Sequence, residues 1–360
     1  MTKENRLIKN AFLRALMETI SPTGQETAAS EIWRREARIL ADEVKGDFMG
    51  NSIAILNPKG KTKIMIAGHI DEIGIQITNI DKDGFLHFQP LGGFDLQVLP
   101  GQRVILLGLR KKTIGVVGRK AIHLQDPEER KKVAKYENLW IDIGARDKKN
   151  AEEHVEVGSV GVLDYGGPIK LLNNLLIGRA FDDRIGAFII LEAMRRIKEL
   201  GGIKAALYSV ATTQEEIGAL GAMTSCSKIE PHIAIAVDVG FATDTPTLES
   251  ARKKMNDIKM GHGPIIARGP NINPKLFKFI KKIAIENVIP YQVVAFSRQT
   301  GTDARSFQIN GSGAATGLIS IPNRYMHSPC EMVHQDDVWN AIELFARVIL
   351  AIDNHKQFVI

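Results

Sequence analysis

Apolar, strand-like segments alternate with amphipathic, helix-like segments at both ends of this chain, and the alternation stops in the middle. The first part predicts helices over residues 3–20 and 26–44 and strands over residues 52–56 and 63–67. After residue 171 the alternation returns and predicts further elements: helices over 185–200, 274–287 and 338–353, and strands over 205–212, 233–237, 291–296 and 314–319. This order indicates an α/β fold, with a mostly parallel sheet and helices on both faces.

The middle of the chain, residues 73–165, has a different pattern of apolar residues. Only residues 127–135 follow a helical pattern there, and the remainder consists of short runs rich in Val, Ile and Phe that glycines separate: 75–78, 85–88, 104–107, 114–117, 139–143 and 155–162. We therefore predict a small all-β domain, a barrel or a sandwich, inserted into the α/β domain. The predicted division assigns residues 1–72 and 166–360 to the α/β domain.

Charge and cysteine content restrict the partners and the compartment. The 360 residues include 47 Lys and Arg and 41 Asp and Glu, a formal net charge of +6, and these charges form no basic block. A nucleic acid partner is therefore not predicted. The two cysteines, Cys226 and Cys330, form no CxxC pair and suit a reducing compartment. Neither a signal peptide nor a run of about 18 apolar residues is visible, so we expect a cytoplasmic protein without a membrane partner.

Ligand sites in mostly parallel sheets collect at the carboxyl ends of the strands. The strand over residues 63–67 leads into His69 and Asp71. Because residues two apart in an extended segment face the same way, Asp71 is placed to orient the ring of His69, as is usual for a metal-binding histidine. A surface His–Asp pair would give the same pattern.

Two pairs of adjacent carboxylates stand at similar positions. Asp182 and Asp183 precede the helix over residues 185–200, where they could simply cap the helix. Glu215 and Glu216 close the buried strand over 205–212, where charge is costly unless a partner or a metal neutralises it. The residues alone leave open which member of each pair binds a metal.

Two more candidate ligands follow predicted strands. Asp238 ends the strand over residues 233–237, and His327 lies in the loop after the strand over 314–319. Singly, each could be a loop cap or a histidine bound to backbone. Five strand ends that deliver His, Asp, Glu-Glu, Asp and His together indicate a dinuclear metallohydrolase.

The sequence also resembles a known family over nearly its whole length. The matching segments are Ser-Pro-Thr-Gly at 21–24, Gly-His-Ile-Asp-Glu-Ile-Gly at 68–74, Ala-Phe-Asp-Asp-Arg-Ile-Gly at 180–186, Thr-Gln-Glu-Glu-Ile-Gly at 213–218, Asp-Val at 238–239, Gly-Thr-Asp-Ala at 301–304 and Tyr-Met-His-Ser-Pro at 325–329. These resemble the tetrahedral, or glutamyl, aminopeptidases of the zinc-peptidase superfamily, some of which are named endoglucanase M. The resemblance implies a phosphorylase/hydrolase-like catalytic fold and an inserted oligomerisation domain at residues 73–165.

The resemblance also assigns the ligands of two divalent ions per subunit. It implies that His69 and Asp238 bind one ion, that Glu216 and His327 bind the other, and that Asp182 bridges them. Two ions bring a charge of +4, and three carboxylates and a bridging hydroxide bring −4, so the expected site is neutral. A mixed imidazole and carboxylate set suits Zn²⁺ or Co²⁺, and also Mn²⁺.

By the same resemblance, Glu215 is the general base that activates a metal-bridged water, and Asp71 orients His69. The expected activity is hydrolysis of N-terminal residues from peptides with a free N-terminus. The expected assembly is a homo-oligomer, a dodecamer built from dimers.

Two alternatives remain open at this point. A glycoside hydrolase could use Glu215 and Asp182 as its carboxylate pair, although His69 and His327 would then have no role. A non-catalytic metal-binding assembly protein could keep the fold, although an intact Glu215 beside a full ligand set argues against it.

Overall fold

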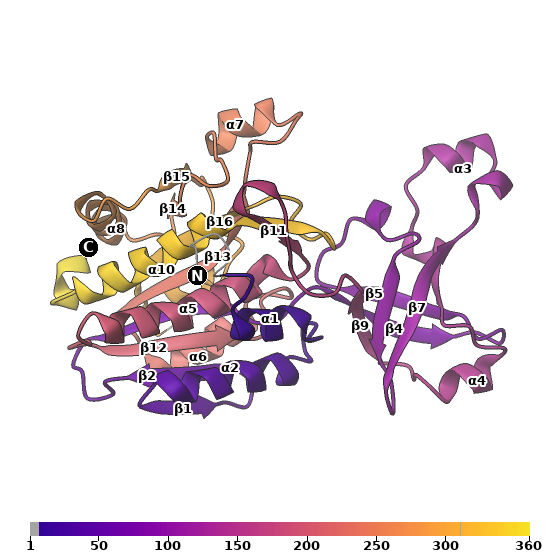
Figure 1. Cartoon of the computed structure of the whole chain (residues 1–360), viewed down its shortest axis with the longest axis horizontal. Coiled ribbons are helices and arrows are strands. Elements are labelled where there is room, and N and C mark those ends of the chain that lie inside the picture. Colours follow the sequence, from indigo (N-terminus) through magenta and orange to yellow (C-terminus); the bar gives the residue numbers. More distant parts are fainter. Residues whose placement is uncertain (1–6, 310) are drawn as a thin grey trace.

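The computed structural model describes residues 7–309 and 311–360, and it divides into an α/β body and a smaller barrel that lies beside it (Figure 1). Residues 3–6 of the first predicted helix lie outside the described residues. Among the described helices, none has both the length and the apolar character that are needed to cross a bilayer.

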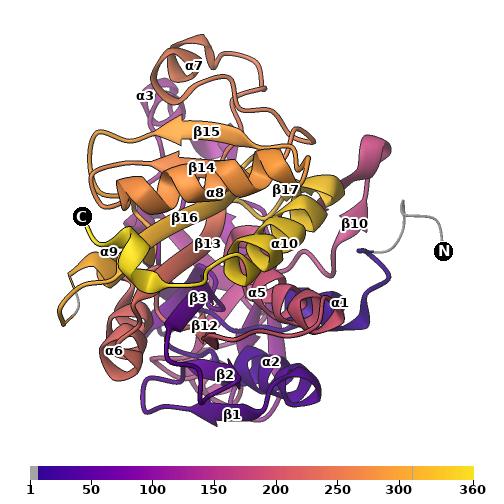
Figure 2. The same ribbon diagram turned by 90° about the vertical axis from the view of Figure 1, so that its left-hand side faces the viewer.

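The body is built on an eight-stranded sheet, whose strand order is visible in Figure 2. In spatial order the strands are β1 (Glu43–Gly46), β2 (Ser52–Leu56), β12 (Ala206–Thr212), β3 (Lys63–His69), β13 (Ile233–Phe241), β16 (Ala315–Asn323), β14 (Ile265–Arg268) and β15 (Gln292–Ala295). The four central strands, β12, β3, β13 and β16, are parallel, so their carboxyl ends meet at one edge. On either side, β2 is antiparallel to β12 and β14 is antiparallel to β16. At the edges, β1 is antiparallel to β2, and β15 is parallel to β14.

Helices cover both faces of the sheet. One face carries α1 (Ala11–Glu18), α2 (Thr27–Leu40), α5 (Phe181–Glu199), α8 (Pro274–Glu286) and α10 (Gln335–Leu350), and the other carries α6 (Leu220–Ile229) and α9 (Ala304–Gln308). Strand β3 shows why both faces are needed. Its side chains alternate, with Ile64 and Ile66 in one core and Met65 and Ala67 in the other.

The barrel closes six antiparallel strands around its own apolar core. In order around the barrel they are β4 (Gly74–Ile80), β5 (Leu86–Leu91), β8 (Leu139–Asp142), β7 (Lys112–Arg119), β6 (Arg103–Leu107) and β9 (Val160–Leu163). Its helices are α3 (Pro127–Lys131) and α4 (Lys148–Glu152). The predicted fold class, an α/β domain with an inserted all-β domain, is confirmed.

A third, small sheet holds the segment that leads into α5. It consists of β10 (Ile169–Lys170), β11 (Leu175–Gly178) and β17 (Glu331–His334), in that order. The remaining elements are α7 (Glu249–Met255) and the 3₁₀ turns Leu96–Val98, Ile122–Leu124, Tyr136–Asn138, Leu172–Asn174 and His355–Phe358.

Several predicted boundaries were wrong. The helix predicted over residues 26–44 ends at Leu40, because the chain turns into the edge strand β1 at Glu43. The strand predicted over 155–162 starts only at Val160, after α4. Helix α6 was missed, because small residues such as Gly221, Ala222 and Ser225 give it no helical apolar pattern, although all three are buried.

Candidate metal centre

His69 is the last residue of β3, and its ring lies within the carboxyl edge of the sheet. Its Nε2 is 3.0 Å from Asp182 Oδ1, and its Nδ1 is 3.4 Å from Asp71 Oδ1. Asp71 therefore does lie behind the ring, as the two-residue spacing predicts. Its carboxylate also accepts hydrogen bonds from the backbone N–H groups of Glu215 and Glu216, at 3.2 and 3.3 Å.

Asp182 lies in the irregular first turn of α5, in which the peptide bond to Asp183 is cis. Its two oxygens face different imidazoles, since Oδ1 is 3.0 Å from His69 Nε2 and Oδ2 is 3.3 Å from His327 Nε2. Asp183 points elsewhere and accepts hydrogen bonds from the backbone N–H groups of His69 and Gly186. Only Asp182 of this pair faces the cluster.

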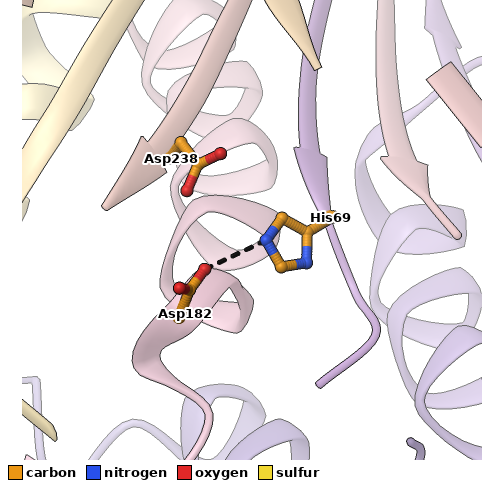
Figure 3. Close-up of side chains that lie close together, drawn as sticks. All are labelled: His69, Asp182 and Asp238. Atoms are coloured by element: carbon orange, nitrogen blue, oxygen red, sulfur yellow. Dashed lines mark hydrogen bonds and ion pairs between the residues drawn. The ribbon is translucent and has the colours of Figure 1, made fainter. Parts of the chain in front are cut away.

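Asp238 completes a first group of three possible ligands. His69, Asp182 and Asp238 point toward one another from β3, the start of α5 and β13, as Figure 3 shows, and their ligand atoms lie within 4.8 Å of one another. All three side chains are buried. Asp238 does not end its strand as predicted, because β13 continues to Phe241.

Glu216 and His327 form a second group with the same Asp182, again within 4.8 Å. His327 Nε2 is 3.4 Å from Glu216 Oε2. His327 belongs to the turn between β16 and β17, and it has a positive φ of 59°. His327 thus lies in the loop after its strand, as predicted, whereas the strand before Asp182 belongs to the small sheet and was not predicted. Asp182 follows β11 of that sheet, and His327 follows β16.

The two groups bring three carboxylates and two imidazoles close together. Burial, reinforced by Asp183 and Asp182, raises the pKa of Asp238 well above its usual range. Burial opposes ionisation of Asp182, but hydrogen bonds from His327 and His69 hold its pKa below the usual range. Carboxylates packed around two imidazoles, with ligand atoms this close, match the donor chemistry of divalent cations.

Glu215 differs from its neighbour in its surroundings. Burial raises its pKa to about 8, with His69 opposing and Asp303 and Glu216 adding to the rise. Its side chain lines a cavity of about 420 Å³ that also contains Asp182, Glu216 and His327. Glu215 is therefore positioned to face a bound molecule.

Glu331 is a buried residue next to the ligand groups, and the sequence analysis did not identify it. Its Oε2 accepts a hydrogen bond from the backbone N–H of Asp182 at 2.8 Å, and its Oε1 accepts one from that of His327 at 3.1 Å. It thereby joins the first turn of α5 to the turn after β16. Its place four residues after His327 is the only sequence signal, and it gives no hint of the contact with Asp182.

The barrel also approaches the centre, through the two glycines after β5. A Cβ on Gly92 would lie 3.2 Å from Glu216 Oε2, and a Cβ on Gly93 would lie 3.3 Å from His327 Nδ1. Gly92 has a φ of +82°, which favours glycine. A segment of the predicted all-β domain therefore packs directly against the second group.

The topology of the sheet and the two overlapping groups of possible ligands at its carboxyl edge fit a metallohydrolase. The sequence profile of the M42 glutamyl aminopeptidase family matches residues 50–344. The chain belongs to this family, and it is accordingly a hydrolase that acts as an aminopeptidase.

Similar proteins support this assignment. A lysyl aminopeptidase of Pyrococcus furiosus is 38% identical over 85% of this chain and 86% of its own length. The crystal structure of a TET aminopeptidase from a marine sediment thaumarchaeon superimposes with a TM-score of 0.91 at 34% identity, over 97% of this chain and 99% of the other. The Pyrococcus horikoshii TET1 peptidase, which can assemble into a tetrahedron or a large octahedral shell, gives a TM-score of 0.84 at 28% identity, over 95% and 99% of the two chains.

Proposed function

We propose that the two ligand groups hold two divalent ions and form the catalytic centre of this aminopeptidase. His69 and Asp238 bind one ion, Glu216 and His327 bind the second, and Asp182 bridges the two. The observation that carries the proposal is the orientation of Asp182, whose two oxygens face the imidazoles of His69 and His327 separately. The glycoside hydrolase alternative gives these two histidines no role.

Bound divalent ions lower the pKa of a water molecule and polarise the carbonyl of the scissile peptide bond. Glu215 accepts a proton from the attacking water and passes it to the leaving amine. Its half-buried side chain lines the cavity, which supports this role. Asp71 orients the ring of His69 and, by accepting the N–H of Glu215, holds the backbone of the base.

The ions we propose are Zn²⁺ or Co²⁺, with Mn²⁺ as a third candidate, because the ligand set mixes imidazole and carboxylate. The substrates we propose are peptides with a free N-terminus. A cytoplasmic location is supported by the two cysteines, Cys226 and Cys330, which are free in the structure.

We also propose that the chain forms a homo-oligomer, a dodecamer built from dimers, through the barrel. The shells formed by the Pyrococcus horikoshii relative support this proposal. So does the outer face of the barrel strand β7, where Ile114 and Val116 are 62% and 44% exposed. Adjacent exposed apolar side chains of this kind are typical of interfaces.

The test of the catalytic proposal is metal dependence combined with dependence on a free amine. Protein stripped with a chelator should lose activity toward an aminoacyl-anilide and toward a free peptide, and adding Zn²⁺, Co²⁺ or Mn²⁺ should restore both. The N-acetylated form of the same peptide should be inert under all conditions. Equal cleavage of free and acetylated peptides by the stripped protein would refute the proposal.

A further inference from the structure

We infer that the cavity beside the metal centre selects a neutral, apolar N-terminal side chain that is larger than a methyl group, such as that of leucine or methionine. This inference rests on the proposed function, because the cavity selects a substrate side chain only if the adjacent cluster is catalytic. The names of the family and of the lysyl relative refer to charged N-terminal residues, glutamate and lysine, so the inferred preference differs from both.

The walls of the cavity are apolar on the side away from the metal centre. They come from the sheet strands β13, β14, β15 and β16 and from the residue directly after β15: Phe241, Ile265, Val294, Leu318 and Phe296. Three of these five, Ile265, Val294 and Leu318, are at most 5% exposed and belong to one apolar cluster, so this surface is part of a packed core and has a fixed shape.

The charged groups of the cavity are concentrated at its other end. All four lining carboxylates, Asp182, Glu215, Glu216 and Asp238, belong to the metal centre and the proposed base. No carboxylate is left on the apolar walls to pair with the ammonium group of a lysine side chain. Because burial of an unpaired charge is costly, a lysine side chain should be rejected.

A glutamate side chain meets a related difficulty. Apart from His327, the only cationic residue that lines the cavity within the described part of the chain is Arg305. Its Nη2 lies 3.8 Å from the position that a Cβ on Gly218 would take, which places the guanidinium beside the loop that carries Glu215 and Glu216. Arg305 therefore stands at the metal end and adds to the repulsion of a cation, whereas the apolar walls offer nothing to a carboxylate.

The size of the cavity points to a long side chain. Its volume of about 420 Å³ is far more than a methyl group fills. Each methylene group that covers an apolar wall is worth roughly 10-fold or more in kcat/KM. Leucine and methionine should therefore be preferred over glycine and alanine as well as over the charged residues.

The experiment compares p-nitroanilides of leucine, methionine, alanine, lysine and glutamate on the metal-loaded protein. We expect kcat/KM for leucine and methionine to exceed each of the other three by roughly 10-fold or more. A lysine or glutamate derivative that is cleaved as fast as the leucine derivative would overturn the inference. Failure of the proposed function looks different, because no derivative would then be cleaved in a metal-dependent manner.

A variant tests whether the cavity itself causes the preference. Met255, at the end of α7, is a half-buried lining residue, so Met255→Glu places a carboxylate on the wall. The ratio of lysine to leucine turnover should rise by roughly 10-fold or more. The matched control is Ile285→Glu on α8, a residue that is 63% exposed and outside the cavity. An unchanged ratio in Met255→Glu, or an equal rise in the control, would overturn the inference.

Product binding gives a readout that does not depend on turnover. Free leucine should bind to the wild-type holoenzyme roughly 10-fold or more tightly than free lysine, by isothermal titration calorimetry. Equal affinity for the two amino acids would contradict the proposed role of the apolar walls, whether or not the Met255→Glu variant folds.

Discussion

Glu215 and Glu216 are neighbours in the chain, yet their side chains have different surroundings. Glu216 Oε2 lies 3.4 Å from His327 Nε2, within a group of possible metal ligands. Glu215 belongs to neither ligand group, although both side chains line the cavity. Both follow β12, which ends at Thr212, in a segment that turns at Glu216. The two side chains are therefore placed differently, so that one carboxylate can bind a metal and the other can face the substrate.

This difference leads to a pair of substitutions with opposite effects. Glu215→Gln keeps the size of the side chain but cannot accept a proton, so kcat should fall by about 10²–10⁴-fold while metal content is retained. Glu216→Gln should lose one ion per subunit, because an amide is a poor substitute for a charged ligand. The measurement is metal stoichiometry together with kcat under limiting metal. Loss of a metal from Glu215→Gln and not from Glu216→Gln would reverse the two roles.

Glu331 allows a second test at the level of single residues. Glu331→Gln leaves one oxygen to accept the two backbone N–H groups of Asp182 and His327, so the ligands lose part of their support. Metal affinity should fall by about 10–100-fold, whereas kcat at saturating metal should change less. Calorimetric metal titration measures the first quantity. Glu286→Gln, an exposed carboxylate on α8, serves as the control, and equal affinities in the two variants would argue against a positioning role.

At the scale of elements, the loop after β13 is tied to the end of β16 by one ion pair. Arg324 donates to Asp244 through Nε at 2.8 Å and through Nη2 at 2.7 Å. Burial opposes ionisation of Asp244, but the hydrogen bonds from Arg324 and from the N–H of Met260 hold its pKa below the usual value. The pair therefore favours the folded state only while Asp244 is ionised.

The stability of this connection should depend on pH in a defined direction. A lowered pKa in the folded state stabilises the protein above the unfolded pKa of about 3.9, and that contribution disappears as the pH falls through the folded value. Asp244→Asn should cost about 1–3 kcal/mol at pH 7, and the difference from wild type should shrink below about pH 4. Denaturant unfolding at pH 7 and pH 3 measures both. The exposed Asp257→Asn should change stability by less than about 0.5 kcal/mol, and a pH-independent cost for Asp244→Asn would contradict the pair.

At the scale of the whole molecule, two surfaces of the barrel are of interest. One side packs against the metal centre through Gly92 and Gly93. The outward face of β7 exposes Ile114 and Val116, and nothing in the described residues of one subunit covers them. A second copy of the chain is the partner that the proposed assembly provides.

Charges on this strand should therefore weaken the assembly. The double substitution Ile114→Asp and Val116→Asp should lower the mass measured by light scattering, because a buried carboxylate without a partner is costly at an interface. The control is Ile39→Asp on α2, which is 66% exposed on the α/β body and should keep the wild-type mass. An unchanged mass in the double variant would exclude this face of the barrel from the interface.

The sequence by itself determined the types and order of most elements. Continuous apolar runs predicted β2 at its observed bounds and located the central strands β3, β12, β13 and β16, because strands that are buried on both faces of a sheet are apolar throughout. The pattern of apolar residues also distinguished the barrel from the body. Resemblance to a family added the choice of Asp182 over Asp183 and of Glu216 over Glu215, which periodicity could not make.

Only the tertiary structure decided how these residues meet. Glu331 lies 149 positions from Asp182, and the barrel glycines lie more than 120 positions from Glu216, so no local pattern could reveal either contact. The apolar cavity is likewise assembled from four strands that are scattered between Ile233 and Asn323. Local sequence determines which face of an element is apolar, whereas the contacts that orient a ligand or select a side chain depend on how distant elements pack together.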